Sequence, residues 1–243
     1  TYQESGFLEE AEKAYRTAIE VDRYHRLDLK AVPLSNLGIC LLEKGDPEGA
    51  REMFERALII DPESWKARYG LVSALIFLGQ FDSAKEKIEK DVFSFPGNFQ
   101  LQAAHSLILL KVGDYRGAIR EAHKSLLVET IPDLYKVLGE AHARLGENDM
   151  ARLYWKKHSH TNPDDIESFF ALLYLYNLSD DEKNFRQTAV RILNLKGGRT
   201  WEQLFLQTKQ QRKNEIPVFS IKPAIIMPLI QKALDKEVVE IMR

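Results

Sequence analysis

The sequence predicts an all-α fold, a solenoid built from stacked helical hairpins. The first observation behind this prediction is a glycine that recurs between two stretches of helical periodicity, at spacings of 34, 34 and 33 residues: Gly45, Gly79, Gly113 and Gly146. A glycine just past a helix end accepts the left-handed conformation that closes the helix. A fixed period of a few tens of residues indicates a repeat architecture, because each short helical unit buries its apolar face only against its neighbours.

A small residue five positions after each glycine is the second observation: Ala50, Ala84, Ala118 and Ala151. At this position the second helix of a hairpin presses against the first, which requires a small side chain. Prolines recur where a new hairpin starts, with one slightly out of step: Pro62, Pro96, Pro132 and Pro163. Because proline is tolerated in the first turn of a helix, we expect each to mark a helix start, with Asp61 and Asn162 as N-caps.

The composition of the 243 residues excludes several classes of function. The 34 Lys and Arg nearly balance the 36 Asp and Glu, so the chain lacks the broad positive charge that attracts nucleic acid or an anionic membrane. Its apolar runs are far shorter than the roughly 18 to 20 residues that span a bilayer. The single cysteine, Cys40, cannot form an internal disulfide, which weakly favours a cytoplasmic location. We therefore expect neither nucleic-acid binding nor membrane insertion.

The repeat register divides the chain into a repeat array at residues 1–199 and C-terminal helices at residues 200–243. Within the array we expect a partial first hairpin at 1–22, whole hairpins at 31–64, 65–98, 99–131 and 132–165, and a divergent hairpin at 166–199. In the divergent hairpin Asp180 replaces the turn glycine and Phe185 replaces the alanine. The partial first hairpin lacks most of its first helix, so we expect the chain to be a piece of a longer protein.

An end element is expected after the array. Residues 200–214 form a predicted helix, and apolar residues recur with helical spacing from Ala224 onward. Solenoids need an element that covers the last exposed apolar face, so we expect these helices to cap the array. The alternative is that the last helix docks onto a partner or onto the rest of a longer chain.

These residues resemble the tetratricopeptide repeat family. The family pattern has Leu then Gly in the first helix, as in Leu37-Gly38 and Leu138-Gly139. Across the turn it has Gly, an aromatic residue and Ala, and in the second helix an aromatic residue, Ala and then Pro; the matching residues are Gly79, Phe81 and Ala84, Gly113, Tyr115 and Ala118, and Phe54, Ala57 and Pro62. Other second helices replace the alanine by Asp91, Ser125 and His158. The acidic residue predicts looser packing at that position.

The resemblance implies a right-handed α-solenoid of tetratricopeptide-type helix-turn-helix repeats, whose first helices line a concave groove. In this register the residues expected to form a peptide-binding groove are Ser35, Tyr69, Ser73, Phe77, Gln100, Leu107, Lys111, Lys136, Glu140, Arg144, Phe170, Tyr174 and Asn177. The mixture of aromatic, apolar and charged side chains suits an extended peptide or an amphipathic helix. Aromatic anchors carry much of the energy of such interfaces, so the four aromatic residues are the main candidates. The alternative for each is packing against a neighbouring hairpin or under the C-terminal helix.

A narrower function of the family is not expected. Members that bind the acidic C-terminal tails of heat-shock chaperones use a clamp of Lys, Asn and Arg on three successive first helices. Asn36 and Lys66 would match the last two of these helices, but Gly70 stands where the arginine is needed.

No pattern predicts catalysis, a metal or a cofactor. Cys40 has the same place in its helix as Ala74 and Ala141 in theirs, so it is expected to be a small core residue. The closest histidine pair, His158-Ser159-His160, lacks further ligands at metal-binding spacing. The Gly197-Gly198 pair follows no predicted strand, unlike a phosphate-binding loop. We therefore expect no catalytic residue, no metal site and no cofactor.

The leading hypothesis is a protein–protein interaction scaffold that binds a peptide or helix of a partner protein in its groove. A second hypothesis is an accessory region that recruits substrates or partners for a larger enzyme, for example a transferase, whose catalytic domain lies upstream of Thr1. Self-association through the helix at residues 224–243 is a third.

Overall fold

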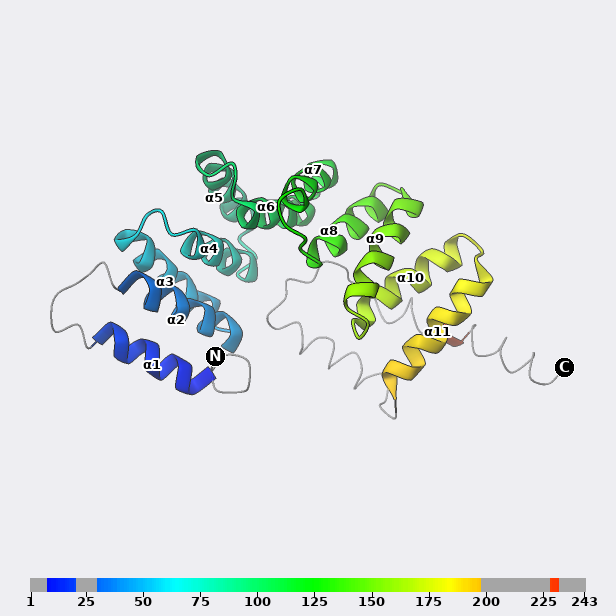
Figure 1. The fold of residues 1–243 in the computed structure, drawn as a ribbon, viewed down its shortest axis with the longest axis horizontal. Coiled ribbons are helices and arrows are strands. Elements are labelled where there is room, and N and C mark those ends of the chain that lie inside the picture. The colour runs from blue at the N-terminus through cyan, green and yellow to red at the C-terminus, as the bar shows by residue number, and fades with distance from the viewer. Residues whose placement is uncertain (1–7, 21–29, 198–227, 232–243) are drawn as a thin grey trace. The chain divides into compact units, whose positions relative to one another are not determined.

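A computed structural model describes residues 8–20, 30–197 and 228–231 of the protein. These residues form helices and short connections, with no strand among them (Figure 1). The helices are α1 (Leu8–Glu20), α2 (Ala31–Lys44), α3 (Pro47–Ile60), α4 (Trp65–Phe77), α5 (Phe81–Ser94), α6 (Phe99–Val112), α7 (Tyr115–Leu126), α8 (Asp133–Arg144), α9 (Asn148–Thr161), α10 (Ile166–Leu178) and α11 (Glu182–Lys196). Consecutive helices pack in pairs, which confirms the predicted all-α repeat architecture.

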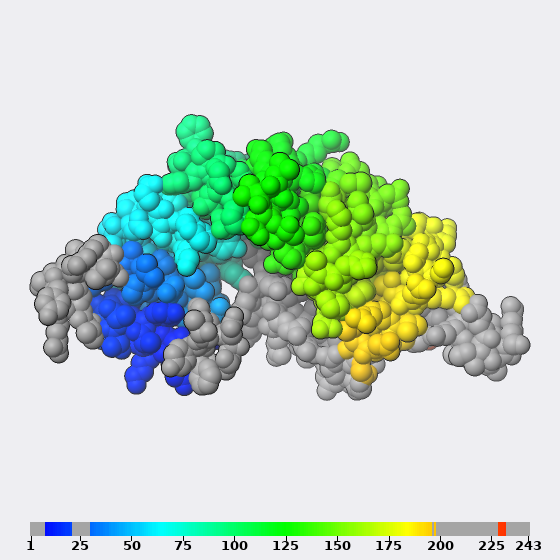
Figure 2. Space-filling model, in the orientation of Figure 1, coloured from blue at the N-terminus to red at the C-terminus, as the bar shows by residue number. Residues whose placement is uncertain are grey.

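The chain forms two compact units that divide between Val112 and Gly113. Unit 1 contains α1 to α6, and unit 2 contains α7 to α11 with residues 228–231. The division falls inside the hairpin predicted at 99–131, whose first helix, α6, belongs to unit 1 and whose second, α7, to unit 2. Figure 2 shows α8 to α11, coloured green to yellow, packed in sequence order. None of the described helices is long and apolar enough to cross a bilayer.

The four turn glycines all adopt the left-handed conformation. Their φ angles are 81° at Gly45, 72° at Gly79, 88° at Gly113 and 76° at Gly146. A side chain is strained in this region, so the recurring glycines allow the same tight connection after each first helix. In the divergent hairpin Asp180 takes this place with a φ of 51°. The prediction that the glycines lie at equivalent bends is confirmed.

The prolines have a different role from the predicted one. Pro62 and Pro163 lie in the connections before α4 and α10 and not in a first helical turn, so the prediction that they start helices is wrong. Asp61 and Asn162 are the C-caps of α3 and α9, and both have backbone angles outside the helical region. A proline disfavours the helical conformation of the residue before it, so these prolines end the preceding helix.

Other side chains cap the helices that follow. The carboxylates of Asp46, Asp114, Asp165 and Asp181 each accept a hydrogen bond from the backbone N–H three residues on, at 2.9 to 3.2 Å. Ser64 does the same for α4. Such caps satisfy backbone donors that have no partner within the helix.

A glycine in each first helix of the matching hairpins makes room for an aromatic side chain of a second helix. Phe54 on α3 is fully buried and lies against both Gly38 on α2 and Gly70 on α4. A Cβ atom at Gly38 would lie only 2.8 Å from the Phe54 ring, and one at Gly70 would lie closer still. In unit 2, Gly139 makes the same contact with the buried Trp155. The Leu-Gly pairs of the sequence therefore mark close contacts between helices.

The position that is usually alanine in the second helix is tightly packed even where a polar residue replaces it. Asp91 is 2% exposed and forms an ion pair with Arg68 of α4, so the prediction of looser packing there is wrong. Arg68 also donates to the carbonyl oxygen of Pro62 at 2.6 and 3.0 Å and lies over the ring of Phe95. A buried carboxylate is tolerated here because a cation on the neighbouring helix pairs with it.

The described end of the chain packs onto unit 2. Ile230, in the short helical segment 228–231, is 1% exposed and belongs to the buried cluster formed by α9, α10 and α11. The predicted helix at 200–214 and the rest of the helix from Ala224 lie outside the described residues. Cys40 is fully buried, as predicted.

The Gly70 contact predicts a sharp size limit. Gly70→Ala should lower the free energy of unfolding by about 1–3 kcal/mol, because the new methyl group would overlap the enclosed Phe54 ring. Gly97→Ala is the matched control, since a Cβ at Gly97 meets no atom within 4 Å. Urea unfolding of both variants measures the difference. Equal stabilities of the two variants would contradict the packing described here.

Candidate functional site

The groove residues predicted in unit 1 lie on the first helices of its hairpins. Ser35 is on α2, three are on α4 and three on α6. The two serines, Ser35 and Ser73, are buried, and their hydroxyls donate to backbone oxygens of their own helices at 2.9 and 3.0 Å. The other residues retain accessible surface: Tyr69, Phe77, Gln100, Leu107 and Lys111. Five of the seven predicted contacts in unit 1 are therefore accessible.

Helix α4 presents the most aromatic surface among these helices. Tyr69 is 42% exposed and Phe77 is half-buried. Trp65, one turn before Tyr69, is 38% exposed, and the ammonium group of Lys66 lies 6.0 Å from the centre of its ring. Residues four apart neighbour each other on a helix surface, so Trp65 extends the aromatic edge that starts at Tyr69. Trp65 was not among the predicted groove residues, although its four-residue spacing from Tyr69 could have indicated it.

The groove residues predicted in unit 2 are largely engaged within the unit. Lys136, Glu140 and Phe170 are 6%, 2% and 5% exposed. The Nζ atom of Lys136 lies 3.5 Å from carboxylate oxygens of Asp165 and Glu167. Glu140 accepts a hydrogen bond from Nε of Arg144 at 2.6 Å. The residues of this set with accessible surface are Arg144, Tyr174 and Asn177.

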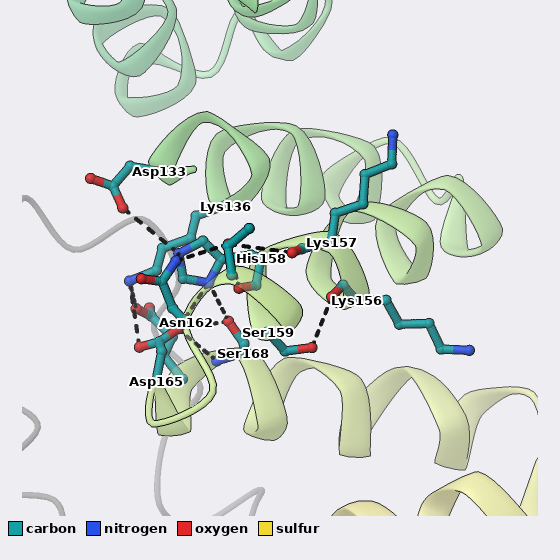
Figure 3. Close-up of polar contacts among 11 residues, drawn as sticks. Asp133, Lys136, Lys156, Lys157, His158, Ser159, Asn162, Asp165 and Ser168 are labelled. Carbon is teal, nitrogen blue, oxygen red and sulfur yellow. Dashed lines mark hydrogen bonds and ion pairs between the residues drawn. The ribbon is translucent and has the colours of Figure 1, made fainter. Parts of the chain in front are cut away.

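A buried polar cluster joins α8, α9 and the start of α10 (Figure 3). At its centre is His158, which is 1% exposed and occupies the alanine position of α9. Its Nδ1 atom lies 2.7 Å from the hydroxyl oxygen of Ser168 and 3.3 Å from Oδ2 of Asp165. The amide nitrogen of Asn162 lies 3.0 Å from Nε2 on the other side of the ring. The Ser168 hydroxyl donates to Asp165 at 2.6 Å.

The carboxylates of this cluster shift the pKa values of its members. Burial alone would raise the pKa of Asp165, but the hydrogen bond with His158 and the nearby Lys136 ammonium outweigh it and hold the pKa well below its usual range. Burial alone would lower the pKa of His158, but the carboxylates of Asp133 and Asp165 outweigh it and raise the pKa. The same interaction lowers the pKa of Asp133. The carboxylates of Asp133 and Asp165 and the protonated ring of His158 are therefore stabilised in the folded state.

The serine, histidine and aspartate of the cluster are not arranged for nucleophilic catalysis. In a catalytic triad the acid binds one ring nitrogen and the nucleophile the other, and the nucleophile is open to substrate. Here Ser168 is fully buried, and both ring nitrogens of His158 already lie near carboxylates, with Nδ1 3.3 Å from Asp165 and Nε2 3.7 Å from Asp133. Among the described residues, no group of three or more His, Cys, Asp and Glu side chains could hold a metal ion. The contacts of the cluster join three helices.

The cluster predicts a pH dependence of stability. The pKa of His158 is raised on folding, so its contribution is fully present below about pH 6.5 and is lost as the pH rises through the folded pKa. The pKa of Asp165 is lowered, so its contribution is present above about pH 3.8 and is lost as the pH falls. Near pH 6, His158→Gln should lower the unfolding free energy by about 2 kcal/mol.

Urea unfolding from about pH 5 to about pH 8 checks this prediction, because the difference between the wild type and His158→Gln should shrink towards the upper end. His160→Gln, an exposed histidine on the same helix, is the control and should leave the stability nearly unchanged. A difference that stays constant over the whole range would contradict the assigned role of His158.

Comparisons with known proteins agree with this architecture. Residues 1–63 match one tetratricopeptide repeat model and residues 41–108 match another. No curated protein matches the chain. The structure of a tetratricopeptide repeat protein from Parabacteroides merdae is similar to this one with a TM-score of 0.62 at 16% identity, over 96% of this chain and 94% of that one.

Two further solved structures are similar in fold. PilF of Pseudomonas aeruginosa is 20% identical with a TM-score of 0.62, over 84% of this chain and 85% of that one. YrrB, described as a TPR protein with an unusual peptide-binding site, is 19% identical with a TM-score of 0.54, over 82% of this chain and 99% of that one. At these identities the likeness concerns the fold alone. The two family matches identify tetratricopeptide repeats within residues 1–108, and the paired helices and the solved structures show that the described part of the chain shares the fold of such repeats.

Proposed function

We propose that this protein binds a peptide or a helix of a partner protein along the first helices of its hairpins, and that it performs no chemistry of its own. The repeats and the structural neighbours support a protein-interaction scaffold in general. The observation that carries the more specific proposal is the accessible aromatic edge of α4. Tyr69 is 42% exposed on a helix whose next residues, 70–76, are all buried.

The chemistry of the unit 1 surface suits a peptide with apolar anchors. Leu107 and Lys111 on α6 add an aliphatic side chain and a cation to the aromatic residues of α4. Aromatic side chains supply large contact areas at a small cost in conformational entropy, so they are frequent hot spots of binding. The fold likeness to YrrB, whose description names a peptide-binding site, supports the same class of ligand.

Burial of the reactive side chains supports a binding function over catalysis. Cys40, His158 and Ser168 are each at most 1% exposed. A nucleophile or general base has to reach a substrate, and these groups are enclosed by packed helices. We therefore assign them to the core of the fold.

Selection from a peptide display library, with the wild-type protein as bait, tests the proposal. Peptides that bind along α4 should bind Tyr69→Ala and Tyr69→Ala/Phe77→Ala at least about tenfold more weakly, because each change removes an aromatic anchor. The further substitution Tyr174→Ala tests whether unit 2 takes part. Fluorescence anisotropy measures the affinities.

The control is Phe93→Ala on α5, since Phe93 is 88% exposed and lies on a second helix. Thermal unfolding followed by circular dichroism verifies that each variant folds. If every selected peptide keeps its full affinity for Tyr69→Ala/Phe77→Ala, the first helices are not the binding surface.

A further inference from the structure

Unit 1 has a concave surface that involves none of the predicted groove residues. It is a pocket of about 550 Å³ lined by α3, α4 and α5: Glu55, Leu58, Ile59, Leu71, Leu75, Ser83, Glu86, Lys87 and Lys90. Leu71 and Leu75 of α4 are each two residues from a predicted groove position, which is about 200° around the helix. The α3–α5 pocket and the aromatic edge of α4 therefore lie on opposite sides of that helix.

Each wall of the α3–α5 pocket is a single face of one helix. The lining residues of α5 follow the spacing i, i+3, i+4 and i+7, and those of α3 follow i, i+3 and i+4. Each wall is thus one continuous stripe along a helix. The floor residues Leu71 and Leu75 are one turn apart, which matches apolar side chains one turn apart on a bound helix.

The wall formed by α3 contains two apolar side chains that retain accessible surface. Ile59 on α3 is 81% exposed, next to the half-buried Leu58 and above the buried leucines of the floor. A partner that covers Ile59 and the leucines beside it would remove apolar surface from water, and this burial would favour binding.

The other wall carries a positive charge with no ion pair among the described residues. Both acidic residues of the lining have cation partners, since Glu86 pairs with Lys90 at 2.7 Å and Glu55 with Arg51 at 3.8 Å. Lys87 also lines the pocket and forms no such pair within the described part of the chain. A carboxylate on a bound helix would complement this ammonium group.

We propose that the α3–α5 pocket is a second docking site, and that it binds an amphipathic helix of another protein with an apolar stripe and an acidic edge. The apolar stripe covers Ile59, Leu71 and Leu75, and the acidic edge faces Lys87. The site is independent of the aromatic edge of α4, so the protein can bind two partner segments at once.

Selection from a display library of helical peptides of about 16 residues, roughly four turns, tests the proposal with the wild-type protein as bait. One class of binders should have apolar residues three and four positions apart and acidic residues along one edge. These peptides should bind Ile59→Glu at least about tenfold more weakly. Lys87→Glu should weaken them similarly and should favour the same peptides with lysine along that edge.

Phe93→Glu is the matched control, because Phe93 is an exposed residue of α5 outside the pocket lining and the substitution adds the same charge. Peptides of this class should keep their affinity for Phe93→Glu and for Tyr69→Ala/Phe77→Ala. If these peptides lose affinity for Tyr69→Ala/Phe77→Ala but keep it for Ile59→Glu and Lys87→Glu, the α3–α5 pocket is not their binding site. That result would leave the proposed site on the first helices intact. A selection that yields no peptide of this class would also overturn the proposed pocket site. So would self-association of the wild-type protein that Ile59→Glu abolishes, because the pocket would then bind a second copy of this chain.

Discussion

The close contact of a second helix with the first helices on both of its sides is the constraint on which unit 1 depends. A single helical pair cannot bury its own apolar face. Phe54 joins α3 to both α2 and α4, because its ring is fully buried against Gly38 and Gly70. In unit 2, Trp155 and Gly139 form the corresponding contact between α9 and α8. An aromatic ring and the absence of a Cβ atom together allow the helices to approach closely.

Where the small residue of the second helix is replaced by a polar one, a polar contact joins the neighbouring helices instead. Asp91 pairs with Arg68, and His158 binds Ser168 and Asp165. Each contact links the second helix to a neighbouring first helix, as the apolar contacts do. Such buried polar groups stabilise only the arrangement in which all partners meet, so they also favour one register of the helices.

The sequence was sufficient to predict the repeat architecture because its strongest signals are local. The left-handed glycines follow from backbone sterics alone, and the period of 34 residues follows from the length of two short helices and their turns. The helix caps were less predictable, because both Asp61 and Ser64 are suitable N-cap residues within one connection. Pro62 ends α3 after Asp61, which leaves Ser64 as the N-cap of α4. Only the structure shows that Pro62 follows the end of α3 and that Ser64 caps α4.

The surface could be predicted only in part, because exposure depends on the neighbouring helices. Tyr69 is accessible as expected, whereas Lys136 and Glu140 are enclosed by partners in the same unit. The α3–α5 pocket has no sequence signal of its own, since its floor and its two walls come from three different helices. The aromatic edge of α4 and the α3–α5 pocket lie on opposite sides of that helix. This arrangement suits a scaffold that brings separate partner segments together.

Native-state hydrogen exchange tests the central role of the Phe54 contact most directly. If one buried ring joins α2, α3 and α4, their slowest amides should exchange in a single cooperative opening. Phe54→Leu should then lower the opening free energy of all three helices by the same amount. Faster exchange in α3 alone, with α2 and α4 unchanged, would contradict the account.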